Sequence, residues 1–321
     1  MTVADRRALG LLLRTGASVV MLGVLVSRVH LSSITPEWHK TTLLWLLGAV
    51  ALTGVGVVIA AVRWQAVLAG LDRPEPLSAL LHHALAGLFV GNFLPSTVGG
   101  DVLRVRRLAA HNHDAATSFA SVIYDRLSGM LVLPAITLTA LATNSGLREL
   151  GGASLLAAGL SVATLVLLAV TLFLVGHPRI GGRVTGTSRW REFAGAVHLG
   201  AHRFRRHPRA VAELVLTAFA YQLAMVFAAL LAARALNIHQ VGLTAALAFV
   251  PAVAIAQTIP ISIGGFGLRE GAFVVFLHPL DVSTSRAVGL GLFVYALNLI
   301  VSLAGAPSFA MGSRHAPRTV A

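Results

Sequence analysis

Two stretches of the chain share a set of residues suited to binding a charged group. In each, an amide side chain precedes a proline by three positions, a glycine pair follows the proline, and an arginine follows the pair. The two copies are 165 positions apart. The first copy consists of Asn92, Pro95, Gly99, Gly100 and Arg104, and the second of Gln257, Pro260, Gly264, Gly265 and Arg269.

This pattern predicts a broken helix followed by a cationic helix start. Proline removes a backbone donor and breaks a helix, and a glycine pair permits close approach or a left-handed backbone. The arginine then lies in the first turns of the next helix, where its guanidinium and the free N–H groups can together hold an anion such as phosphate. Asn92 and Gln257 would add neutral hydrogen bonds. The alternative is that both breaks are ordinary packing devices.

Three further charged residues belong to the candidate site. Asp101 lies within the first copy, Glu270 follows Arg269, and Arg126 falls inside an apolar stretch beside Asp125. An unpaired charge inside a membrane costs on the order of 2.5–3.5 kcal/mol. Arg126 is therefore expected either to face a polar cavity or to bond, like Asp125, to neighbouring helices. Glu270 is expected to pair with an arginine of another helix or, if buried, to act as a titratable carboxylate.

Other polar clusters suggest no chemistry of their own. Arg63 and Trp64 are interpreted as a snorkelling cation and an aromatic anchor near a helix end. The run from His111 to Asp114 lacks the spacing of a helical metal site, and Asp114 is expected to cap a helix that opens with Ala115. The sequence predicts no metal, no cofactor and no catalytic residue, because nucleophile, phosphate-loop and acidic metal motifs are missing.

The elements that must position these residues are membrane helices. Hydrophobic residues make up 56% of the 321 and charged residues only 12%, with a mean hydropathy of +0.80, whereas soluble domains are about 25% charged. Spans of about 20 apolar residues are predicted at residues 8–29, 42–70, 117–143, 152–176, 210–236 and 286–311. Two interrupted stretches, 77–94 and 242–280, are predicted to be broken, re-entrant elements.

The distribution of the net charge of +13 predicts the orientation. Basic clusters at residues 6–7, 104–107, 179–209 and 314–318 all fall on one side if the N-terminus is cytoplasmic. That asymmetry favours a multi-pass cell-membrane protein with both termini in the cytoplasm and no nucleic-acid partner. Within the loop at 177–209, apolar residues at helical spacing predict an amphipathic helix on the inner leaflet, with docking of an anionic lipid or a partner as the alternative.

The chain is therefore predicted to be an all-α, polytopic, single membrane domain over residues 1–321. The first half-repeat covers about 42–143 and the second about 210–311, separated by the basic loop. In this topology the two broken elements enter from opposite sides and form an inverted pair, an arrangement from which transporters build a site at the bilayer midplane.

The two motifs, together with Tyr124-Asp125-Arg126 and the run from Phe266 to Glu270, resemble the lysylphosphatidylglycerol synthase transmembrane-region family, also called flippase-like domain proteins. The resemblance covers nearly the whole chain. It implies a membrane protein that moves an anionic or aminoacylated phospholipid, or a lipid-linked headgroup, between leaflets. Members of this family that carry a synthase domain have it after the membrane part, and the chain ends soon after its last predicted span, so no synthase activity is expected.

Two other functions remain open at this stage. A membrane-embedded transferase acting on a lipid carrier would need an acid or base, and Asp101 and Glu270 are the candidates. An accessory subunit would instead scaffold an envelope-lipid enzyme through the basic loop. The transport hypothesis assigns phosphate contacts to Arg104, Arg126 and Arg269.

Overall fold

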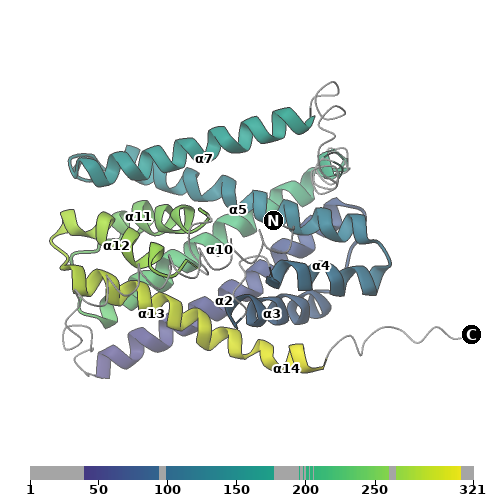
Figure 1. Cartoon of the computed structure of the whole chain (residues 1–321), viewed down its shortest axis with the longest axis horizontal. Helices are drawn as coiled ribbons and strands as arrows, with labels where there is room; N and C mark the ends of the chain where they lie inside the picture. Colours follow the sequence, from purple (N-terminus) through teal and green to yellow (C-terminus); the bar gives the residue numbers. More distant parts are fainter. Residues whose placement is uncertain are drawn as a thin grey trace, which may run out of the picture.

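The computed structural model describes residues 40–93, 99–176, 206–259 and 265–311, with six further positions between 195 and 204. Within these ranges the chain is helical and contains no strand (Figure 1). The predicted first span, 8–29, lies outside the described residues, as do Pro95, Pro260, Gly264 and most of the basic loop.

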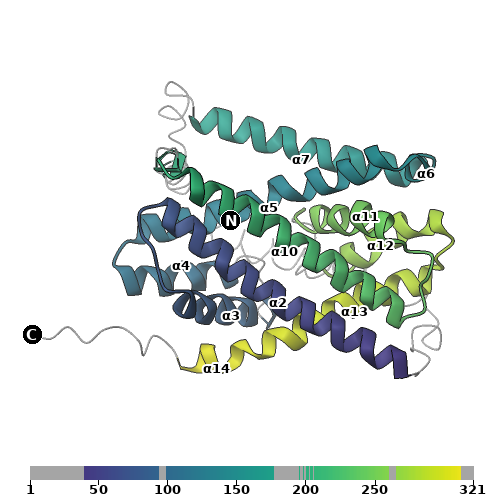
Figure 2. The same ribbon diagram turned by 180° about the vertical axis from the view of Figure 1, so that it is seen from behind.

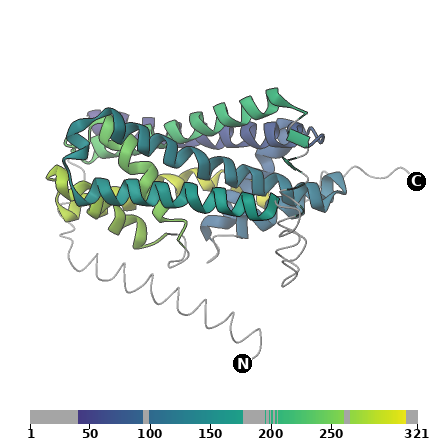
Figure 3. The same ribbon diagram turned by 90° about the horizontal axis from the view of Figure 1, so that it is seen from above.

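Among the described residues, five helices are long and apolar enough to cross a membrane, which agrees with the predicted multi-pass architecture. They lie side by side along one direction (Figure 3). Large apolar side chains such as Leu155 and Leu216 are 75% and 69% exposed, as expected for a surface in contact with lipid. The five helices are α2 (Lys40–Gly70), α5 (Ala115–Thr143), α7 (Gly152–Gly176), α10 (Pro208–Ala235) and α13 (Thr284–Leu303).

The last predicted span, 286–311, is not one continuous helix. Helix α13 ends at Leu303, and a short helix, α14 (Gly305–Ala310), follows. The break lets Gly305 pack directly on helix α3 (Leu77–Phe93), where a Cβ atom would lie 2.1 Å from the carbonyl oxygen of Leu85. The prediction of a single helix to residue 311 was therefore wrong.

The predicted stretch 77–94 is not broken, because α3 runs through it as one helix and a second short helix follows it, whereas the stretch 242–280 contains two short helices. The first hairpin consists of α3 and α4 (Gly99–Asn112), and the second consists of α11 (Leu243–Ala256) and α12 (Leu268–Leu277). Helix α12 continues into a 3-10 turn, η2 (His278–Leu280), and a one-turn helix, α6 (Ser145–Arg148), joins α5 to α7. The described helices agree with a break within 242–280 but not within 77–94, and re-entry into the membrane stays a prediction.

Helices α2 and α10 pack against each other in opposite directions (Figure 2). Gly48 near the start of α2 adjoins Leu231 near the end of α10, and Gly56 adjoins Met225. A shift of 165 positions carries the last residue of α2, Gly70, onto the last residue of α10, Ala235. This geometry is what an inverted repeat requires, although the division into half-repeats stays a prediction.

The helix after the first hairpin begins where the sequence predicts. Helix α5 opens with Ala115, and the Asp114 Oδ1 atom accepts a hydrogen bond from the Thr117 amide at 2.9 Å. That hydrogen bond holds the pKa of Asp114 below its usual value, because it stabilises the carboxylate. The turn that joins α4 to α5 is therefore fixed by a charged N-cap.

Candidate functional site

Five charged side chains from α2, α4 and α5 form an ion network beside the first hairpin. Arg63 Nε donates to Asp125 Oδ1 at 2.7 Å, and Arg104 Nη1 donates to Asp125 Oδ2 at 3.0 Å. Arg126 Nε donates to Asp101 Oδ2 at 2.8 Å, and Asp101 also lies 3.5 Å from Arg104 Nη1. One aspartate from α5 is thus shared between arginines of two other helices.

The network has a buried interior and one accessible cation. The side chains of Asp125, Arg63 and Arg104 are 4%, 10% and 13% exposed, whereas Arg126 is 59% exposed. The Arg104 guanidinium lies 4.1 Å above the ring of Trp64, a stacking that suits a planar cation. Arg126 is therefore the most exposed arginine of the network.

A cavity of about 280 Å³, here called the hairpin cavity, adjoins this network. Helix α3 lines one side with Asn92, and the start of α4 lines another with Gly100 and Asp101. All five network residues line it. The first copy of the sequence motif therefore contributes its amide, its second glycine and its arginine to one cavity.

The second hairpin neutralises its arginine in a different way. Arg269 donates from Nε and Nη2 to the Oε1 atom of Glu270, at 3.1 and 3.0 Å. The Oε2 atom of Glu270 accepts a hydrogen bond from the Gly267 amide at 2.7 Å. The Glu270 side chain is fully buried and Arg269 is 5% exposed, so this pair is compact and local.

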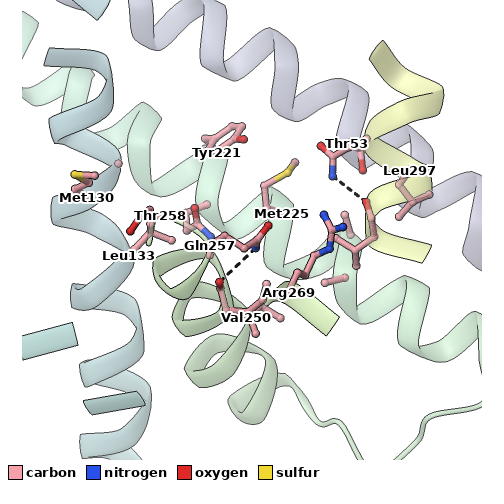
Figure 4. A pocket seen from close by; sticks show the side chains of 18 of the residues that line it. Thr53, Met130, Leu133, Tyr221, Met225, Val250, Gln257, Thr258, Arg269 and Leu297 are labelled. Atoms are coloured by element: carbon pink, nitrogen blue, oxygen red, sulfur yellow. Dashed lines mark hydrogen bonds between the residues drawn. The ribbon is translucent and has the colours of Figure 1, made fainter. Parts of the chain in front are cut away.

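A second cavity of about 330 Å³, here called the central cavity, is lined by residues of α2, α5, α10, α11, α12 and α13. Arg269 and Gln257 point into it towards Met225 of α10 (Figure 4). The other polar lining residues include Thr53, Gln222, Thr258 and Asn298. The second copy of the motif therefore faces a cavity that α5 and α10 also line.

Four residues line both cavities: Arg63, Asp125, Arg126 and Tyr221. Among the predicted site residues, Asn92, Asp101 and Arg104 line the hairpin cavity and Gln257 and Arg269 line the central cavity. Arg126 belongs to both, while Glu270 lines neither. The predicted residues thus gather around two adjoining cavities rather than in one shared pocket.

The glycines of the two motifs serve different purposes. A Cβ atom on Gly100 would lie 2.3 Å from the carbonyl oxygen of Gly87, so a glycine is needed for α3 and α4 to touch. Gly265 instead has a φ angle of +77°, a left-handed conformation that disfavours other residues.

Two sequence-based interpretations need correction. Glu270 pairs with its neighbour Arg269 rather than with an arginine of another helix, because its carboxylate folds back to cap Gly267. Arg63 and Trp64 are not an interfacial anchor, since Arg63 is bound to Asp125 and the Trp64 indole donates to Ser121 Oγ at 2.9 Å. The sequence did contain a signal for this ion pair, because Arg63 and Asp125 lie in two different predicted spans and buried charges of opposite sign tend to pair.

The arrangement can bind anions, and the described residues contain no group of three metal-ligating side chains. No curated protein matches the chain. The model of the family described as "Lysylphosphatidylglycerol synthase TM region" matches residues 8–305, which is nearly the whole chain. The chain therefore belongs to the lysylphosphatidylglycerol synthase transmembrane-region family.

Proposed function

We propose that this protein is a flippase-like lipid translocator that moves a lipid with an anionic headgroup between the leaflets of the cell membrane. The observation that carries the proposal is the position of Arg126, an accessible cation that lines both cavities. A headgroup bound to Arg126 would be in contact with both cavities at once. Family membership supports a lipid-related role in the membrane.

The residues of the proposed site have three roles. Arg104, Arg126 and Arg269 contact the phosphate, and Asn92 and Gln257 donate neutral hydrogen bonds. Asp101 and Glu270 orient the arginines to which they are bonded. Ligand pockets of roughly 300 Å³ are at the small end of the usual range, so volumes of about 280 and 330 Å³ suit a headgroup whose acyl chains stay in the bilayer.

The proposed orientation follows from charge and symmetry. Both termini lie in the cytoplasm, and the two hairpins enter the membrane from opposite sides as halves of one membrane domain. The sequence lacks a nucleotide-binding motif, so the proposed transport is passive or driven by an ion gradient. The partner is a membrane phospholipid with an anionic headgroup.

The geometry disfavours a transferase. Asp101 is bound to Arg126 at 2.8 Å, and Glu270 is fully buried between Arg269 and the Gly267 amide. Asp101 is already engaged by Arg126, and Glu270 lines neither cavity, so neither carboxylate is placed to react with a bound substrate. We therefore propose a transporter rather than an enzyme.

The proposal is tested by leaflet exchange of a fluorescent phosphatidylglycerol in reconstituted vesicles, with dithionite quenching of the outer leaflet as the readout. We expect wild-type protein to accelerate exchange over protein-free vesicles and Arg126→Ala to reduce that acceleration at least about tenfold, since a charged hydrogen bond contributes about 1.5–3 kcal/mol.

The matched control is Arg106→Ala, which removes an exposed arginine of α4 that lines neither cavity. Equal activity of the two variants would contradict the role of Arg126. Wild-type exchange no faster than in protein-free vesicles would contradict the proposed function itself.

A further inference from the structure

The two halves of the site differ in net charge. The ion network contains three arginines and two aspartates, Arg63, Arg104, Arg126, Asp101 and Asp125, which leaves one positive charge in excess. In the second hairpin, Arg269 and Glu270 neutralise each other, so this pair has no excess charge. Because burying an uncompensated charge is costly, the hairpin cavity is the place where one negative charge is most favourable.

The hairpin cavity also contains two unused hydrogen-bond donors. Arg104 Nε and Asn92 Nδ2 are buried and have no hydrogen-bond partner among the described residues. Both residues line this cavity. Unsatisfied buried donors are rare in folded proteins and are costly, and both would be satisfied by an acceptor oxygen in the cavity.

We propose that the hairpin cavity is a phosphate subsite selective for a singly charged phosphodiester. The proposal rests on the proposed function and specifies the headgroup chemistry of that site. One phosphodiester charge neutralises the network, and the two non-bridging oxygens accept from Arg104 Nε and Asn92 Nδ2. A phosphomonoester carries about −1.5 to −2 charges at pH 7, so it would leave negative charge beside Asp101 and bind more weakly.

The test is equilibrium binding of two soluble probes to the purified full-length chain in phosphatidylcholine nanodiscs, measured by calorimetry. The probes are glycerophosphoglycerol, a phosphodiester, and glycerol phosphate, a phosphomonoester. We expect the phosphodiester to bind at least about tenfold more tightly at pH 7.5. As the pH falls below about 6, the monoester becomes singly charged, so its affinity should approach that of the diester, whose own affinity stays constant.

A parallel experiment replaces the soluble probe with phosphatidylglycerol added to the nanodiscs. Competition between this lipid and glycerophosphoglycerol assigns the site to a lipid headgroup. Binding of the soluble probe without competition assigns it to a free phosphodiester. Both results support the phosphodiester subsite, whereas a monoester that binds as tightly as the diester at pH 7.5 overturns it.

Two variants locate the subsite. Asn92→Leu removes one unused donor, and Arg104→Lys keeps the charge but removes the unused Nε donor. We expect each to weaken phosphodiester binding about tenfold or more, since each removes one charged hydrogen bond. Gln240→Leu is the matched control because Gln240 is exposed in the loop before α11. Unchanged affinity in both site variants would overturn the assignment.

The readouts separate this proposal from the proposed function. Selective binding without leaflet exchange would retain the subsite and reject transport. Leaflet exchange with equal affinity for mono- and diester would retain transport and reject the subsite. The wild-type preference between the two probes also stands without any variant, so a variant that fails to fold leaves the proposal falsifiable.

Discussion

The two hairpins are built from one sequence pattern but obtain their counter-ions from different places. Arg104 of the first hairpin bonds to Asp125 on α5, whereas Arg269 of the second bonds to the next residue of its own helix, Glu270. A shift of 165 positions carries Asp125 onto Leu290 and Arg126 onto Gly291. Helix α13 therefore offers no charge at the positions where α5 supplies two.

Gly291 explains how the second hairpin tolerates this loss. A Cβ atom at Gly291 would lie 3.0 Å from Glu270 Cγ and 3.1 Å from its Cα, so the glycine makes room for the glutamate. Both copies of the motif thus contain the arginine and lie between two short helices, but the residue that neutralises the arginine differs between them. Among the described residues, ion pairs join the first hairpin to α5, and α5 to Arg63 of α2, whereas the second hairpin has no ion pair with another helix. Of these two groups of charges, the one at the first hairpin keeps an uncompensated positive charge.

The largest expected effect comes from removing the shared aspartate. Asp125→Asn leaves both Arg63 and Arg104 without their counter-ion, and breaking a buried pair costs about 3–5 kcal/mol of folding free energy. Glu270→Gln should cost less, because it strands one arginine and its amide oxygen can still accept from Gly267. Thermal melting of the two variants in detergent measures the difference.

Asp72→Asn is the control for this pair, since Asp72 is 51% exposed and its ion pairs with Arg203 and His207 are at the surface. Exposed ion pairs contribute about 0–1 kcal/mol, so this variant should melt close to wild type. If Asp125→Asn melts no lower than Glu270→Gln, the first hairpin does not depend on α5 for its charge balance.

A smaller effect should separate the two equivalent glycines. Gly100→Ala forces a methyl group against the backbone oxygen of Gly87, so α3 and α4 must move apart, at about 1–3 kcal/mol. Gly265→Ala meets the side chain of Gln257, which can move, and the strain of its left-handed backbone costs about 1–2 kcal/mol. Melting temperatures of the two variants measure which substitution destabilises the protein more.

Gly159→Ala in α7 is the control, because its Cβ atom meets no heavy atom within 4 Å. In a helix interior this change should be neutral or stabilising. The first hairpin should also lose phosphodiester binding in Gly100→Ala, since the cavity lies between its helices. A larger loss of stability in Gly265→Ala would show that backbone conformation, rather than helix contact, limits both hairpins.

The sequence predicted those features of the fold that depend on residues close together in the chain. The length and apolarity of the predicted spans identified α2, α5, α7 and α10, and the Pro/Gly motifs predicted the positions of both hairpins. The cap at Asp114 was also correct, because capping depends on residues three positions apart. These features need no knowledge of distant contacts.

Pairing across helices was not predictable in the same way. Asp125 lies 62 positions from Arg63, and periodicity does not reveal which helix faces which. The rule that adjacent helical residues point to different faces holds for Asp125 and Arg126, since Asp125 accepts from Arg63 and Arg104 whereas Arg126 donates to Asp101. It failed for Arg269 and Glu270, because at the first turn of a helix a glutamate can fold back to cap the preceding amide. Which residue neutralises Arg269 can be decided only from the folded chain, where the neighbours of each charge are known.

The smallest expected effect concerns the helices that follow the hairpins. Helix α5 is capped by the Asp114 carboxylate with a hydrogen bond of 2.9 Å, and α13 is capped by the Ser283 hydroxyl at 3.4 Å. Losing such a cap costs about 1 kcal/mol, so Asp114→Ala and Ser283→Ala should each lower the melting temperature slightly at pH 7. The longer hydrogen bond of Ser283 predicts the smaller change.

The two caps should differ in their dependence on pH. The folded-state pKa of Asp114 is lowered, first by the hydrogen bond from the Thr117 amide. Its stabilisation is therefore complete above the unfolded pKa of about 4 and is lost as the pH falls through the folded value. The penalty of Asp114→Ala should shrink between pH 7 and pH 3, whereas that of Ser283→Ala should not change, because a hydroxyl does not titrate there. A penalty for Asp114→Ala that stays constant over this range would show that packing, rather than the carboxylate charge, holds the first hairpin to α5.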